Sequence, residues 1–195
     1  MKQEALVASI ANVLEADASD VARKNVAQQI MDGKFLLQDL HPMLFLEGKA
    51  PMRFSWMLGY LAEQQAVLVF PCLAFYFKQR HNFKILNFNR SLAKLFSLAG
   101  IPEEIEGEVV SALFDWIQDK QSDVTIKTHS MMAIFKHSEG YPALRQELTL
   151  LIEEGWDQHP VSFKQTGRKI LKTIDPKHQL LRKADEEYLA GSRMR

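Results

Sequence analysis

The side chains that could bind a metal ion or act as nucleophiles are scattered along this sequence. The closest pair of histidines expected on one helix, His129 and His137, lies about 12 Å apart along the helix axis. Because the ligands of a zinc site must converge on one ion, we expect no metal site. Cys72 lies in the most apolar stretch of the chain, which indicates a buried thiol rather than a nucleophile. The other histidines are His41, His81, His159 and His178.

The glycines also carry no chemical motif. They stand where helices are expected to end, and no Gly-rich loop of the kind that cradles phosphates occurs. We therefore expect no bound nucleotide and no other cofactor. Without a catalytic constellation, the sequence predicts a protein that is not an enzyme.

The recurrent polar feature is a basic residue that precedes an apolar stripe at helical spacing. If the helices that carry these residues stack, the basic side chains and one nearby tryptophan could line a groove. The alternative is that they are ordinary solvated side chains, with Trp56 in the core. The residues predicted to line the groove are Arg53, Trp56, Lys127, Lys164 and Arg168.

Helical periodicity runs through the whole chain, and strand signals are absent. Glycines, prolines and capping residues divide it into about ten helices, which we expect to form five antiparallel pairs. Asp123 or Ser122 is expected to cap the eighth helix. The predicted helices are Lys2–Glu15, Val21–Met31, Lys34–Leu46, Arg53–Gln65, Val67–Arg80, Phe83–Ala99, Pro102–Asp119, 123–138, Ala143–Trp156 and Val161–Ile174.

The helix pattern repeats along the chain. Arg53, Asn87, Lys127 and Lys164 occupy matching places before their apolar stripes, at intervals of 34, 40 and 37 residues. Unequal intervals of this size are typical of helical-hairpin solenoids with insertions in the turns. We therefore predict an all-α superhelix, with one repeat domain over residues 1–175. Residues 176–195 are expected to form a capping helix or a flexible tail.

Composition limits the classes of function. The 195 residues include 24 basic and 24 acidic side chains, so net charge steers the protein neither toward polyanions nor away from them. A single cysteine cannot form an internal disulfide, and no leader pattern is evident, so we expect a cytoplasmic location. The longest apolar run, 66–77, is shorter than the roughly 20 residues that span a bilayer. Membrane association is not expected.

Two stretches support a family resemblance: VTIKTHSMMAIFKHSEGYPALRQELTLLIEE and FKQTGRKILKTI. They resemble HEAT and armadillo-type units, and the chain is similar to short bacterial HEAT-like proteins without assigned activity. Some of those proteins carry an adenylosuccinate lyase label. This chain lacks the Met-Pro-x-Lys run of that superfamily and is too short for its long central helices.

The resemblance implies an extended binding surface, so the first functional hypothesis is a non-enzymatic scaffold that binds a protein or peptide. The alternative is a DNA-binding or alkylbase-excision protein, since a family of DNA alkylation-repair glycosylases has a similar helical-hairpin architecture with a basic concave face. Zero net charge weighs against nucleic acid. The pair Asp115 and Trp116 resembles that family's catalytic set only weakly.

Overall fold

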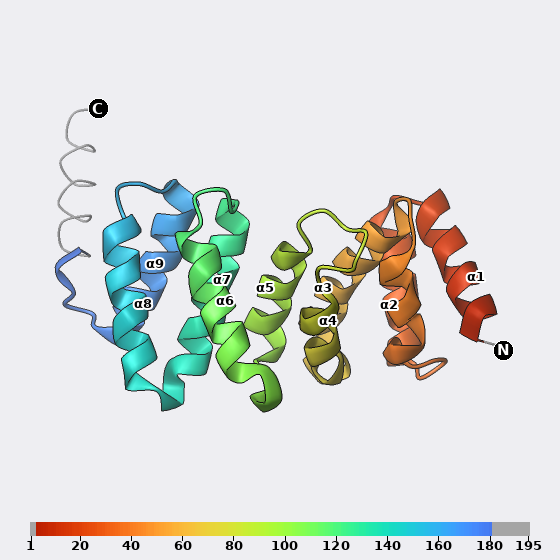
Figure 1. Cartoon of the computed structure of the whole chain (residues 1–195), viewed down its shortest axis with the longest axis horizontal. Coiled ribbons are helices and arrows are strands. Elements are labelled where there is room, and N and C mark those ends of the chain that lie inside the picture. Colours follow the sequence, from red (N-terminus) through yellow and green to blue (C-terminus); the bar gives the residue numbers. More distant parts are fainter. Residues whose placement is uncertain (1–2, 181–195) are drawn as a thin grey trace. The chain divides into compact units, whose positions relative to one another are not determined.

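A computed structural model describes residues 3–180, and every regular element in this range is helical (Figure 1). The prediction of an all-α protein is confirmed for these residues. Nine α-helices and four 3-10 helices follow one another along residues 3–180. Of the predicted capping helix or tail, residues 181–195 lie outside the described part.

The chain divides into two compact units, Met1–Val109 and Val110–Arg195. The 1–175 segment predicted as one repeat domain thus contains parts of both. Within residues 3–109, the elements are α1 (Gln3–Ala16), α2 (Asp20–Met31), η1 (Leu37–Phe45), α3 (Ala50–Val69), η2 (Phe70–Cys72), α4 (Leu73–Gln79), α5 (Phe88–Ala99) and η3 (Glu103–Ile105). Helix α6 (Glu106–Gln118) crosses the division, and α7 (Val124–His137), η4 (Ser138–Gly140), α8 (Pro142–Gly155) and α9 (Val161–Ile174) follow.

Helix α3 is the centre of the first unit. It packs against α1, α2, η1 and α5, so apolar residues on most of its circumference become buried. Burial of such side chains is the main stabilising term in a helical unit of this kind. The fully buried side chains of its middle turns are Phe54, Met57, Leu58 and Leu61.

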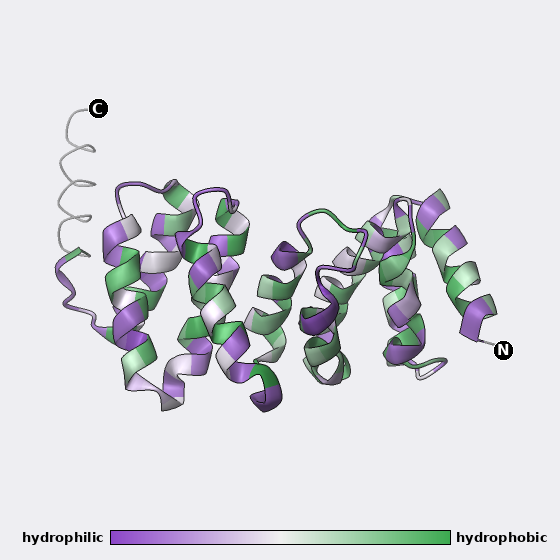
Figure 2. Cartoon of the chain, viewed as in Figure 1, coloured by the Kyte–Doolittle hydropathy of each residue, from purple (hydrophilic) through white to green (hydrophobic). Residues whose placement is uncertain are grey.

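The second unit is built around α7, which packs against α8 and α9. Met131 is fully buried there, whereas its neighbour Met132 is half-buried. The apolar stripe of α7 runs through Ile126, Met131 and Ile134. Figure 2 shows apolar residues along these helices and polar residues in the segments that connect them.

Local capping chemistry sets several helix ends. The Ser19 side chain accepts a hydrogen bond from the Ala22 amide at the start of α2. Asp123, one of the two predicted caps, accepts from the amides of Thr125 and Ile126 at the start of α7. Gly100 ends α5 with a positive φ of 93°, a conformation that side chains other than glycine rarely adopt.

The helices differ from the prediction around Pro42, at Gln65 and around Pro71. The segment predicted as the helix Lys34–Leu46 contains the 3-10 helix η1, and Pro42 within it cannot donate an amide hydrogen bond. The predicted break after Gln65 is a kink: Gln65 has φ −145° and ψ 78° within α3. Pro71 lies in η2, which separates α3 from α4.

The helical stretch from α3 to α4 bears on the membrane prediction. Ala50–Gln79 is longer than the apolar run 66–77, and by length and composition alone it could cross a membrane. In the most apolar window of this stretch, 44% of the residues are buried inside the fold. The core helix of a soluble protein meets the same criteria, so this one stretch is weak evidence for a membrane span.

Candidate functional site

Arg53 belongs to the core of the first unit rather than to an open surface. Its side chain extends from α3 to the C-terminal end of α1, and the residue is 9% exposed. Its Nη1 atom donates to the main-chain oxygens of Leu14, at 2.6 Å, and Glu15, at 2.9 Å. The last carbonyls of a helix lack partners within it and carry partial negative charge. Arg53 therefore caps α1.

Lys127 has the same role in the second unit. It is 3% exposed, and its ammonium donates to the main-chain oxygens of Ile117, at 2.7 Å, and Asp119, at 2.6 Å. These carbonyls end α6. Burial lowers the pKa of Lys127, while the nearby Asp119 carboxylate acts in the opposite direction. Arg53 and Lys127, which occupy matching places in the sequence repeat, therefore share one role: each caps the end of a preceding helix.

The other three residues predicted to line a groove remain accessible. On α9, Lys164 is half-buried and lies 3.6 Å from the Asp157 carboxylate, while Arg168 is exposed one turn later. On α3, Trp56 is 50% exposed. Trp56 lies in the first unit and the two α9 residues in the second. In neither unit do all the predicted groove residues come together.

Trp56 lies in a cleft of the first unit, which we call the Trp56 cleft. It has a volume of about 400 Å³. Helix α3 forms its floor, and α2 and α5, which both pack against α3, form its two walls. Gly59 allows the α5 wall to come close, since a Cβ there would lie 3.2 Å from the Lys94 ammonium. The side chains that line it include Arg23, Lys24, Trp56, Tyr60, Glu63 and Lys94.

Each aromatic ring in the Trp56 cleft has a cation above it. The Arg23 guanidinium lies 5.2 Å from the Trp56 ring centre, and the Lys24 ammonium lies 5.6 Å from that of Tyr60. Asp20 pairs with Arg23 and, at 3.8 Å, with Lys24. These contacts hold two flat, partly exposed rings in place between charged walls.

The α5 wall of the cleft carries a second ion pair, in which Lys94 lies 2.7 Å from Glu63. Of the side chains in this cleft, Trp56 was predicted to line a groove, whereas Tyr60, Glu63 and Lys94 were not. The four-residue spacing from Trp56 to Tyr60 was an available signal, since it places both rings on one helix face. No local signal brings Lys94 to the same place.

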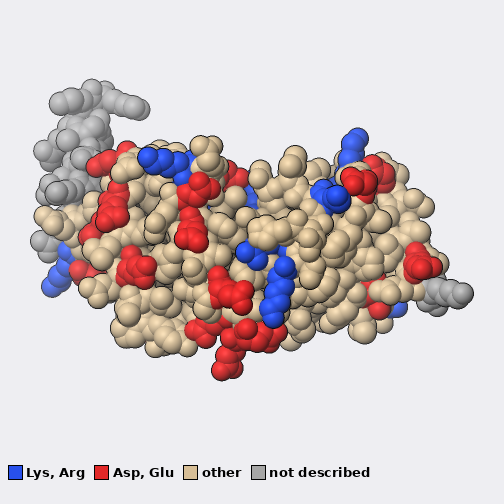
Figure 3. Space-filling model, in the orientation of Figure 1, with Lys and Arg blue, Asp and Glu red and all other residues tan. Residues whose placement is uncertain are grey.

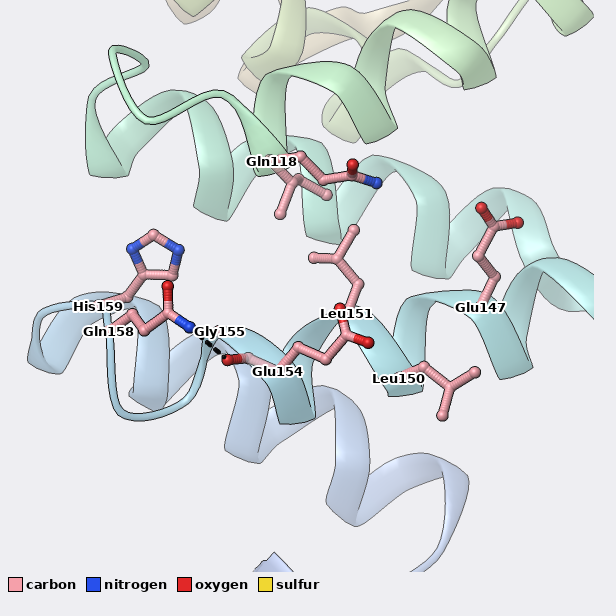
Figure 4. A pocket seen from close by; sticks show the side chains of 9 residues that line it. Gln118, Glu147, Leu150, Leu151, Glu154, Gly155, Gln158 and His159 are labelled. Carbon is pink, nitrogen blue, oxygen red and sulfur yellow. Dashed lines mark hydrogen bonds between the residues drawn. The ribbon is translucent and has the colours of Figure 1, made fainter.

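The second unit has a cleft of different character, the α8 cleft, with a volume of about 370 Å³ (Figure 4). One side is α8, and the other is the end of α6, where Leu151 projects toward Gln118. His159 lies at one end, and burial, followed by the charge of Lys127, lowers its pKa. Residues lining the α8 cleft include Ile117, Glu147, Leu150, Leu151, Glu154 and His159.

Charges elsewhere are mixed. On the face drawn in Figure 3, acidic and basic side chains both occur in each unit, with wide uncharged areas between them. Among residues 3–180, no group of three or more His, Cys, Asp or Glu side chains is placed to hold a metal ion.

Three polar groups lie in the aromatic core of the first unit. Cys72 is buried, as predicted, and burial raises the pKa of its thiol to about 11. Tyr76 is fully buried, and burial, followed by the neighbouring Cys72, raises the pKa of its hydroxyl. The His41 ring stacks on Phe75 with ring centres 4.2 Å apart, and its Nε2 atom is buried without a partner in the described chain. A thiol with so high a pKa is a poor nucleophile.

Comparison of the chain with protein-family models, with curated proteins and with solved structures found no match.

Proposed function

We propose that this protein is a non-enzymatic binding or scaffold protein, and that the Trp56 cleft takes a segment of a protein or peptide partner. The observation that carries the proposal is the position of Trp56, half exposed above α3 and flanked by Tyr60 and Arg23. Trp, Tyr and Arg are the residue types most enriched at binding hot spots. Their grouping in a concave site favours a docking role over a role in the core.

The physical basis is desolvation. An apolar side chain of the partner that covers Trp56 and Tyr60 removes two aromatic surfaces from water, at about 25 cal/mol per Å² of apolar area. The rings lose little conformational entropy on binding, since Arg23 and Lys24 already lie over them. Lys24 is the more exposed of these two cations and suits an acidic group beside the apolar anchor.

We also propose that the helix pairs form a HEAT-like superhelix. The same capping contact occurs twice and supports this proposal. In each case a basic side chain of a later helix, Arg53 or Lys127, caps the C-terminal end of an earlier helix. Repeated contacts of this kind are expected where similar hairpins stack. A small-angle X-ray scattering profile of an elongated, curved particle would agree with the proposal, and a spherical profile would contradict it.

A peptide-library selection tests the binding proposal. The natural chain should enrich peptides with an apolar or aromatic residue next to an acidic one, and Trp56→Ala should weaken their binding about ten-fold or more. The matched control is Leu86→Ala, which removes a 94% exposed apolar side chain of the same unit outside the cleft. Equal losses for both variants, or binding that survives Trp56→Ala, would contradict the proposal.

DNA binding or alkylbase excision is the competing function. Two of the basic residues expected to form a DNA-binding face are not accessible, because the cations of Arg53 and Lys127 are buried against main-chain carbonyls. Filter binding to duplex DNA at two salt concentrations separates the functions. Tight binding that weakens steeply with salt would favour DNA, because phosphate contacts release counterions.

A cytoplasmic location is likewise a proposal, and cell fractionation tests it. We expect the protein in the cytosolic fraction, and its retention in washed membranes would point to the stretch Ala50–Gln79 instead.

A further inference from the structure

The α8 cleft has a charge pattern that the Trp56 cleft lacks. Glu147 and Glu154 lie seven residues apart on α8, two helical turns or about 10 Å. Both are exposed, and within residues 3–180 neither carboxylate takes part in an ion pair. Among the residues that line this cleft none is a lysine or arginine.

Apolar surface lies between the two carboxylates. Leu150 and Leu151 follow Glu147 by three and four residues, so all lie along one stripe of α8. Leu150 is 52% exposed, and Leu151 projects toward the end of α6, where Ile117 also lines the cleft. A partner therefore meets an apolar centre with one negative charge on each side.

The third titratable group at this site is His159. Burial, followed by the charge of Lys127, lowers the pKa of this titratable side chain, so the ring is uncharged at pH 7, and it packs closely against Gly155. A Cβ at Gly155 would lie only 2.9 Å from the His159 ring and 3.1 Å from the Phe163 ring. Lys127, whose charge acts on His159, directs its ammonium to the Ile117 and Asp119 carbonyls. Neither group neutralises Glu147 and Glu154 directly.

We infer that the α8 cleft binds a helical segment of a protein partner in which an apolar residue lies between two basic residues about two turns apart. The apolar side chain packs between Leu150, Leu151 and Ile117, and the basic side chains pair with Glu147 and Glu154. Charge complementarity selects this partner over an acidic one, since like charges across an interface are strongly unfavourable. The inference does not depend on the Trp56 cleft.

A model peptide tests this directly. The probe is a fluorescein-labelled helical peptide with the core Lys-Ala-Ala-Leu-Leu-Ala-Ala-Lys, and its partner probe has Glu in place of both Lys residues. Fluorescence anisotropy should show that the full chain binds the basic peptide and not the acidic one. Binding of the basic peptide should weaken as salt is raised, because exposed ion pairs are screened.

Charge reversal supplies the decisive variant. The double variant Glu147→Lys and Glu154→Lys should bind the basic peptide at least about ten-fold more weakly and should gain binding to the acidic one. Glu139→Lys, at an exposed glutamate of the same unit outside the α8 cleft, is the matched control and should behave like the natural chain. Circular dichroism confirms that each variant is folded.

The gain of binding to the acidic peptide separates a lost contact from a damaged fold. Failure of the natural chain to bind the basic peptide at millimolar concentration would overturn the inference. So would equal binding to the two peptides, or double-variant binding that matches the natural chain.

Discussion

Glu15 and Arg53 cap each other's helices. The Glu15 carboxylate accepts hydrogen bonds from the Lys49 and Ala50 amides, both at 2.8 Å, at the start of α3, while Arg53 of α3 donates to the last carbonyls of α1. A carboxylate thus meets the positive end of one helix and a guanidinium the negative end of the other. This exchange joins α1 to α3 through four hydrogen bonds.

The exchange predicts that Arg53 matters for stability. Arg53→Met should lower the free energy of unfolding by about 2 kcal/mol, because two buried carbonyls lose their partner. Urea denaturation followed by circular dichroism measures the change. Lys84→Met, at an exposed residue of the same unit, should change it by less than about 0.5 kcal/mol. A loss no larger for Arg53→Met than for this control would contradict the assigned capping role.

Lys127 and Lys164 should differ in the same way. Lys127→Met removes the cap of α6 and should cost about 1 to 3 kcal/mol, whereas Lys164→Met removes only an exposed ion pair. Thermal and urea unfolding of the two variants provide the comparison. Similar stabilities would show that the buried hydrogen bonds of Lys127 contribute little.

His41 should make the stability of the protein depend on pH. Burial lowers its pKa in the folded state, while Asp39 acts weakly in the opposite direction, so folding favours the neutral ring. The stability that this group contributes is fully present above the unfolded pKa of about 6.5 and is lost as pH falls through the folded pKa. Urea unfolding between pH 8 and 5 should show a smaller pH dependence for His41→Phe than for the natural chain.

The matched control for that experiment is His81→Phe, because His81 is exposed. Its pH profile should follow that of the natural chain. An unchanged profile for His41→Phe would assign the pH dependence to other groups.

Two glycines should respond oppositely to alanine. At Gly167 a Cβ would lie 2.8 Å from the Ile152 Cγ2 atom, so Gly167→Ala should destabilise the second unit by about 1 to 3 kcal/mol. At Gly107, within α6, a Cβ would meet nothing within 4 Å, so Gly107→Ala should stabilise the protein by about 0.5 to 1 kcal/mol. Melting temperatures that shift in the same direction would disprove the close approach of α8 and α9.

Cys72 should resist modification in the folded protein. Its thiol is buried and has a pKa of about 11, so little reactive thiolate exists at pH 8. A thiol reagent such as DTNB should react slowly with the native chain and at once in denaturant. Rapid native reaction would indicate that η2 opens readily.

The sequence by itself determined the helices and many of their ends, because these depend on residues close together in the chain. Predicted and observed bounds agree for α9, Val161–Ile174, and Asp123 caps α7 as one of the two expected residues. The departures were not located in this way: the periodicity around Pro42 did not distinguish an α-helix from the 3-10 helix η1, and the kink in α3 lies at Gln65.

Only the tertiary structure decided what the basic residues do. Arg53 and Lys164 are alike in the sequence pattern, yet one is buried against carbonyls 38 and 39 residues away and the other forms an exposed ion pair. The Trp56 cleft likewise needs Lys94, which reaches α3 only because α5 packs there. Helical periodicity records which side of a helix is apolar. It does not record which neighbouring helix end lies opposite a charge, and that neighbour determines whether the side chain caps, pairs or binds.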